Sequence, residues 1–259
     1  MPTVLRRLAL FVPPVLVIVC ELGHPVVFPP IYPAVVHHMP WWLRLHIVNL
    51  TLFPLLGLAA YVLVKDVRNR AAAWSRFAIA LFVPLYAAFD ALAGVGTGIL
   101  VQNASRMAPA QRAAAESLID AYWTSGVIAA IAAAGSIAWV IALLAAAVAF
   151  TRPERRRLAG ILAIVEFAVG GWAETNLFLP SQGKIPLTWW LITIGMAVAM
   201  FLVARSSIPA GLLVLAASLF GAMHAPPTGP LGAACFLAAA AYLELAPGRE
   251  PQPEARPAG

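Results

Sequence analysis

Long apolar runs, each close to the thickness of a bilayer, recur along the chain and are separated by short segments rich in charge and proline. A helix of about 20 apolar residues spans a hydrocarbon core of roughly 30 Å. Helices suit that core because they satisfy their own backbone hydrogen bonds. We therefore predict an all-α fold, a polytopic transmembrane helix bundle of eight spans. The predicted spans are 6–28, 43–64, 74–101, 122–150, 158–179, 186–204, 208–225 and 230–246.

The composition supports this class of protein. Apolar residues make up 62% of the 259 residues and charged residues only 11%, which is outside the usual range of soluble domains. We predict a single transmembrane domain over 1–246. The remaining residues, 247–259, hold prolines and charges without an apolar run, and this composition predicts a disordered cytoplasmic tail.

The basic residues predict the orientation. With the N-terminus inside, only four of the 17 Lys and Arg residues fall on the outer side, as the positive-inside rule expects. Both termini are then cytoplasmic, and the location is the bacterial cytoplasmic membrane. The net charge of +6 is thus read as a topology signal and not as a nucleic-acid surface. The four outer residues are Arg44, Arg106, Arg112 and Lys184.

In this orientation all five histidines lie near the outer face. Three of them fall in or beside a proline-rich stretch, GHPVVFPPIYPAVVHHMPWW (23–42), which we expect to cap the bundle. Imidazoles and carboxylates together suit zinc, copper or iron, so the cofactor expected here is a transition metal, with haem less favoured. The alternative is that the histidines only tolerate the headgroup region. The metal-site candidates are His24, His37, His38, His46 and His224.

Polar residues within the spans show the same one-sided distribution. Each costs about 2.5–3.5 kcal/mol on insertion, so a shared polar pocket open to the outside would explain them. Asp90 shares a helical face with Gly94, Thr97 and Gly98, and Glu174 shares one with Glu166 and Gly170. Glu21 ends the first run beside His24. The predicted ligand-binding residues are His46, Asn49, Asp90, Thr97, Glu174 and Asn176.

Three functions remain open at this stage. The first is an integral membrane protein whose outer pocket binds, senses or transports a metal ion or a small polar solute. The second is a membrane enzyme in which Asp90 and Glu174 are the catalytic acid and base on a lipid or isoprenoid substrate. The third is a non-catalytic membrane subunit. The expected partners are the lipid bilayer, a small polar solute or lipid substrate, and further protein chains in a helix-mediated oligomer through Gly94 and Gly98; no nucleic acid is expected.

Three stretches, ELGHP, FDALAGVGTGIL and HAPPTGPLGAACF, resemble segments of small bacterial multipass membrane proteins. The resemblance covers the first four spans and the last one. It implies no established activity, and no site residue is carried over from it. The chain also has no DDxxD-type aspartate cluster, which separates it from membrane-embedded prenyltransferases. Cys20 and Cys235 are either a disulfide pair, part of a metal site or packing residues.

Overall fold

The computed structural model describes residues 3–181, 184–204 and 207–245, which form helices joined by turns and short loops, with no strand in those ranges. The predicted all-α fold is therefore confirmed. The α-helices are α1 (Thr3–Glu21), α2 (Ile31–Val36), α3 (Met39–Val64), α4 (Arg70–Phe89), α5 (Thr97–Ser105), α6 (Pro109–Trp123), α7 (Gly126–Ala149), α8 (Arg156–Ala173), α9 (Leu187–Val203), α10 (Ile208–Ala222) and α11 (Thr228–Leu245). The shorter segments are the π-helices η1 (Asp90–Gly96) and η3 (Glu174–Phe178) and the 3-10 turns η2 (Pro153–Arg155) and η4 (Leu179–Ser181).

Six helical stretches of the described chain are long and apolar enough to cross a membrane. Helices α9 and α10 are apolar but shorter, so the count of eight spans stays a proposal. Each predicted apolar run nevertheless overlaps a helix or a helix continued by a π segment. The first run was predicted too long: α1 ends at Glu21, and residues 22–28 form no helix. The six stretches are Thr3–Glu21, Met39–Val64, Arg70–Ser105, Pro109–Ala149, Pro153–Ser181 and Thr228–Leu245.

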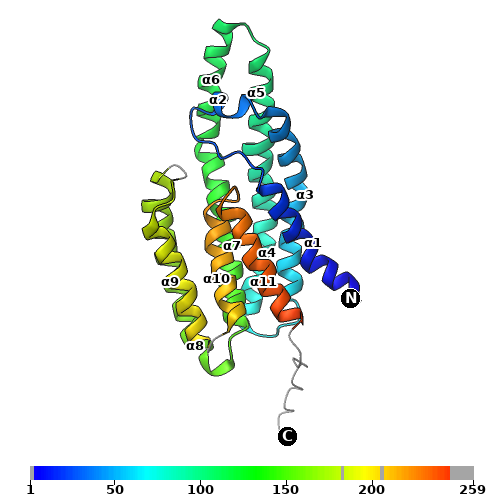
Figure 1. Cartoon of the computed structure of the whole chain (residues 1–259), viewed down its shortest axis with the longest axis vertical. Coiled ribbons are helices and arrows are strands. Elements are labelled where there is room, and N and C mark those ends of the chain that lie inside the picture. Colours follow the sequence, from blue (N-terminus) through cyan, green and yellow to red (C-terminus); the bar gives the residue numbers. More distant parts are fainter. Residues whose placement is uncertain (1–2, 182–183, 205–206, 246–259) are drawn as a thin grey trace.

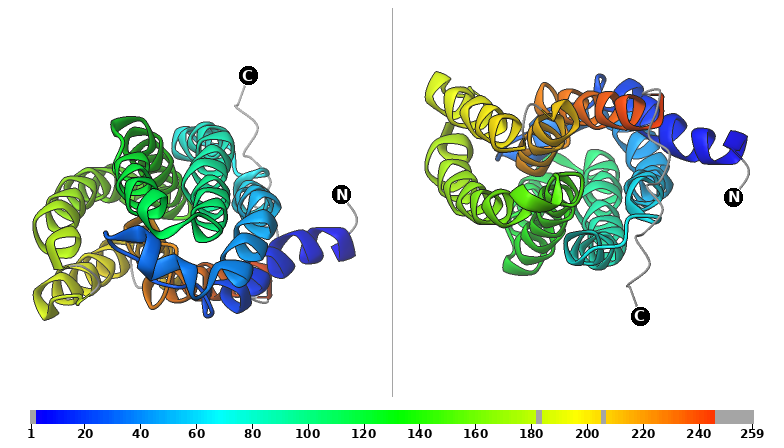
Figure 2. Two further views of the ribbon diagram at one scale, coloured as in Figure 1. Left: turned by 90° about the horizontal axis from the view of Figure 1, so that it is seen from above. Right: turned by 90° about the horizontal axis from the view of Figure 1, so that it is seen from below.

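The helices run up and down along one long axis (Figure 1). Helix α4 packs along α7, α10 packs between α7 and α11, and α3 packs against α1 and α4. The α8–α9 hairpin lies to one side of this bundle, as the end-on views show (Figure 2). Helices α5 and α6 pack together and extend beyond the bundle at the end opposite to the last turn of α11 (Figure 1).

Aromatic side chains fill the centre of the bundle. Phe82 and Phe220 lie with ring centroids 4.9 and 5.1 Å from that of Trp139. The indole N–H of Trp139 donates to the carbonyl of Ala216 at 3.2 Å, so its polar atom is satisfied inside the core. Outward-facing positions are also apolar, and Ile164 is 72% exposed. An apolar exterior around an apolar core is the pattern of a helix bundle surrounded by lipid.

The two ends of the described chain meet at the same end of the bundle. Arg6 Nε donates to Glu244 Oε2 at 2.9 Å, and Arg6 Nη1 donates to Asp66 Oδ2 at 3.0 Å. These contacts join α1, the turn after α3 and α11. The start of α1 and the end of α11 therefore lie close together; the eight crossings and a cytoplasmic location of both termini stay predictions.

Candidate metal site

A buried polar cluster lies where α1, α3, α4 and the α10–α11 connection meet. Three imidazoles come together here although they are far apart in the sequence: the ring centroids of His24 and His46 are 5.0 Å apart, and those of His24 and His224 are 4.9 Å apart. Glu21, at the end of α1, is fully buried beside them. We call Glu21, His24, His46 and His224 the histidine cluster.

Each imidazole of the cluster is held through Nδ1. His24 Nδ1 donates to the carbonyl of Pro25 at 2.8 Å, and His46 Nδ1 lies 2.7 Å from Asp90 Oδ1. His224 Nδ1 lies 3.1 Å from the hydroxyl of Tyr86. The Nε2 atoms of all three rings are buried without a hydrogen-bond partner. Metal-binding histidines show this arrangement, because one ring nitrogen binds the ion and the other is oriented by a carbonyl or carboxylate.

The carboxylates of the site also have one engaged and one unpartnered oxygen. Asn49 Nδ2 donates to Glu21 Oε1 at 2.8 Å, whereas Glu21 Oε2 and Asp90 Oδ2 are buried without partners. One ligand atom each from Glu21, His24 and His224 can be chosen so that all lie within 4.8 Å of one another. Buried polar atoms are costly when unsatisfied, so these oxygen and imidazole nitrogen atoms are suited to bind a further group.

Local backbone structure makes room for His46. The α4 helix widens into the π-helix η1 at Asp90, a feature that often marks functional positions. A Cβ atom at Gly94 would overlap the imidazole of His46, so glycine is required there. The carbonyl of Gly94 accepts the indole N–H of Trp42 at 2.7 Å. The widened turn is thus anchored to α3 by side chains that also form the site.

The proline-rich segment 22–38 covers this end of the bundle, as expected. Its short helix α2 packs against α5 and α6, and the backbone N–H of Ile31 donates to Asp120 Oδ1 at 2.7 Å. Prolines prevent a longer helix, which leaves His24 free to turn inward. His37 and His38 follow α2 and are exposed.

A cavity of about 280 Å³ adjoins the three imidazoles. Its walls are mainly apolar and include Trp42, Phe89 and Phe178. No lysine or arginine lines it among the residues that the structure describes. The cavity wall therefore offers no basic side chain that could neutralise the carboxyl groups of the site.

The structure gathers only part of the predicted site. His24, His46, His224, Asn49 and Asp90 come together, but His37 and His38 do not join them. Glu174 lies in a different cavity from Asp90, so the predicted acid–base pair shares no single cavity. Asn176 is exposed and donates to the carbonyl of Trp172 on its own helix at 2.8 Å. Thr97 is buried but has no hydrogen-bond partner for its hydroxyl.

The sequence analysis did not predict three residues of this region. Tyr86 and Trp42 contact the histidine cluster, and Asp120 binds the segment 22–38 that lies over it. Tyr86 precedes Asp90 by four residues, so helical spacing alone puts both on one face. No comparable spacing in the sequence linked Trp42 or Asp120 to the site. The indole of Trp42 points inward and is fully buried, and the capping contact of Asp120 depends on how α6 packs on α2.

The glycines of GVGTG pack within the chain. Cβ atoms at Gly94 and Gly98 would overlap His46 and Leu43, both on α3. The close helix approach that Gly-x-x-x-Gly predicts is therefore made by α3 of the same chain. Cys20 and Cys235 are free thiols in the structure.

Comparison of the chain with protein-family models, curated proteins and solved structures finds no match. The class of protein thus follows from the fold and composition, which are those of a helical membrane protein, and the function has to be argued from the site.

Proposed function

We propose that the protein binds a divalent transition-metal ion at Glu21, His24 and His224, inside a membrane-spanning helix bundle. This rests on one observation: the imidazoles of His24, His46 and His224 are each held through Nδ1, and each has a buried Nε2 atom without a hydrogen-bond partner. Two histidines and one carboxylate form a ligand set that zinc and non-haem iron both use, with a further position left for water or a solute.

The ring spacing supports a single small ion. Two imidazoles that bind one ion at about 2.1 Å with a tetrahedral angle have ring centroids about 5 Å apart. The centroids of His24 and His224 are 4.9 Å apart. The ring centroid of His46 lies at a similar distance from that of His24, 5.0 Å.

The charge of the site supports a divalent cation. With neutral imidazoles and with Glu21 and Asp90 as carboxylates, the buried group carries a charge of minus two. One divalent ion neutralises it, which removes the large cost of burying unpaired charge. The adjoining cavity then offers room for a small polar solute at the ion's open position.

The predicted topology puts this site at the outer end of a protein of the bacterial cytoplasmic membrane. Exchange of the ion or a solute with the outside would require the segment 22–30 to move. The enzyme alternative with Asp90 and Glu174 as a pair loses support, because the two residues line separate cavities.

The test is metal loading of the purified protein. Protein in mild detergent is stripped with a chelator, dialysed against Zn²⁺ or Co²⁺, and analysed for metal content and for the Co²⁺ visible spectrum. We expect one ion per chain and a spectrum of nitrogen and oxygen ligands, both lost in His24→Ala and His224→Ala. The exposed pair His37→Ala/His38→Ala is the matched control and should load fully.

Two results would overturn the proposal. One is a wild-type protein that holds no stoichiometric ion while its thermal unfolding shows it to be folded. The other is equal loss of metal in the His37/His38 control, which would place binding at the exposed histidines.

A further inference from the structure

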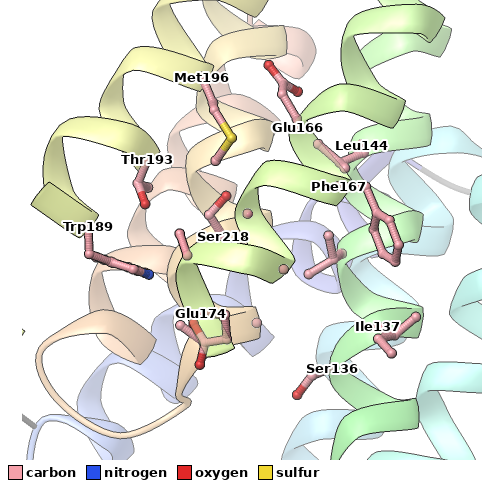
Figure 3. A pocket seen from close by; sticks show the side chains of 16 residues that line it. Ser136, Ile137, Leu144, Glu166, Phe167, Glu174, Trp189, Thr193, Met196 and Ser218 are labelled. Carbon is pink, nitrogen blue, oxygen red and sulfur yellow. The ribbon is translucent and has the colours of Figure 1, made fainter. Parts of the chain in front are cut away.

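A second cavity lies between the α8–α9 hairpin and the helices α7 and α10. Its volume is about 330 Å³, and its walls are mostly apolar (Figure 3). Glu166 and Glu174 lie at opposite ends of it (Figure 3). They are eight residues apart, or about 12 Å along a helix. The lining also includes the hydroxyl groups of Ser136, Thr193 and Ser218 and the indole of Trp189, which hydrogen-bonds Glu174.

Glu166 is the most unusual group of this cavity. The residue is only 3% exposed, and neither carboxylate oxygen has a hydrogen-bond partner. An isolated buried carboxylate is far too costly to leave uncompensated in an apolar wall. An occupant that donates hydrogen bonds and carries positive charge would compensate it.

The charge of the lining restricts the occupant. Both ionisable side chains that line the cavity are acidic, and no lysine or arginine of the described chain lines it. An anionic head group, such as a phosphate or a fatty-acid carboxylate, would therefore be repelled. The aromatic rings of Trp189 and Phe167 also line the wall, and aromatic faces attract cations.

From this charge complementarity we infer that the cavity binds a lipophilic ammonium cation, with the nitrogen at Glu166 and the apolar body between the α8–α9 hairpin and the helices α7 and α10. Glu174 offers a second acidic contact at the other end. The inference does not rest on the metal site. The two cavities share only Ser136 and Ala222 in their walls, and their acidic residues are different.

The test is photo-crosslinking in nanodiscs of phosphatidylcholine. Three probes share one diazirine-bearing alkyl chain and end in an ammonium, a hydroxyl or a carboxylate group. Labelled peptides are identified by mass spectrometry, so binding in the cavity is distinguished from partitioning into lipid. We expect the ammonium probe to label α8 and α9 residues of the cavity at least tenfold more than the carboxylate probe.

Two variants and a control sharpen the test. Glu166→Gln keeps the shape of the side chain and should lower ammonium labelling about tenfold. Gly170→Leu should abolish labelling by filling the cavity, because a Cβ there meets only Met196 Cε, at 3.6 Å. Gly195→Leu is the control, since Gly195 is on α9, has open space around it and does not line the cavity.

Equal labelling by the three probes would overturn the inference and make the cavity a lipid-facing recess. Stronger labelling by the hydroxyl probe would also overturn the inference, because it would indicate that the cavity binds a neutral lipid. Unchanged ammonium labelling in a folded Glu166→Gln variant would show that the carboxylate does not recognise the cation. Folding is checked by size-exclusion elution and thermal unfolding of each variant.

Discussion

The Nδ1 atom of His46 lies 2.7 Å from Oδ1 of Asp90, and both side chains are buried. This contact joins α3 to the first residue of the π-helix η1. It holds the ring through Nδ1 and leaves Nε2 buried without a hydrogen-bond partner. Asp90 is therefore a positioning residue for His46, and in the proposed metal-bound state it supplies one of the two negative charges near the ion.

Replacing Asp90 with Asn should weaken Zn²⁺ binding by about 10–100-fold, the usual effect of altering a group that orients a metal site. The amide oxygen still accepts from His46, so the ring stays in place while the charge is lost. Affinity is measured by competition with a fluorescent chelator. Thr97→Val is the control, because Thr97 is buried nearby without a hydrogen bond; equal weakening there would contradict the assignment.

Replacing Gly94 with Ala should lower the thermal unfolding temperature and the metal content together. The added Cβ overlaps the His46 imidazole, so the ring or the helix has to move. Gly160→Ala on α8 is the matched control, because a Cβ there meets nothing within 4 Å. Alanine favours a helix over glycine by up to about 1 kcal/mol, so the control should be neutral or more stable.

Replacing Asp120 with Ala should loosen the segment 22–38 over the cluster. The carboxylate accepts the N–H of Ile31 at the start of α2, and losing such a contact costs about 1 kcal/mol. Hydrogen exchange followed by mass spectrometry should show faster exchange in this segment and no change in α4. Glu116→Ala, on the same helix, is the control; equal acceleration in both variants would rule out a specific role for Asp120.

The Arg6–Glu244 pair should contribute about 1 kcal/mol to the free energy of unfolding, measured by a double-mutant cycle with alanine. Their side chains are 24% and 13% exposed, so solvent screens them only in part. The Lys65–Asp66 pair is the comparison: Asp66 is 69% exposed, and its coupling with Lys65 should be close to zero. Similar couplings for the two pairs would contradict this ranking.

Single cysteines should report the orientation of the chain. In a background of Cys20→Ser and Cys235→Ser, Met107→Cys should react with an impermeant maleimide in intact cells. Arg152→Cys should react only after the cells are permeabilised. Both positions are exposed in the structure. The reverse pattern would place the histidine cluster at the cytoplasmic end.

The sequence by itself determined the helical class and the position of almost every helix. Apolar runs between charges are local signals, and hydrocarbon permits few alternatives to a helix. Local spacing also predicted that Asp90 shares a buried face with Gly94 and Thr97. Helical spacing likewise predicted that Glu166 and Glu174 share one helical face, and both residues line the same cavity.

Only the tertiary structure decided which polar residues meet. His24 and His224 are 200 residues apart and become neighbours through the packing of α1 and α11. His38 is far nearer to His46 in sequence, yet it lies exposed beyond α2. Helix neighbours and the direction of each face depend on packing summed over the whole bundle, and no local pattern of residues carries that information.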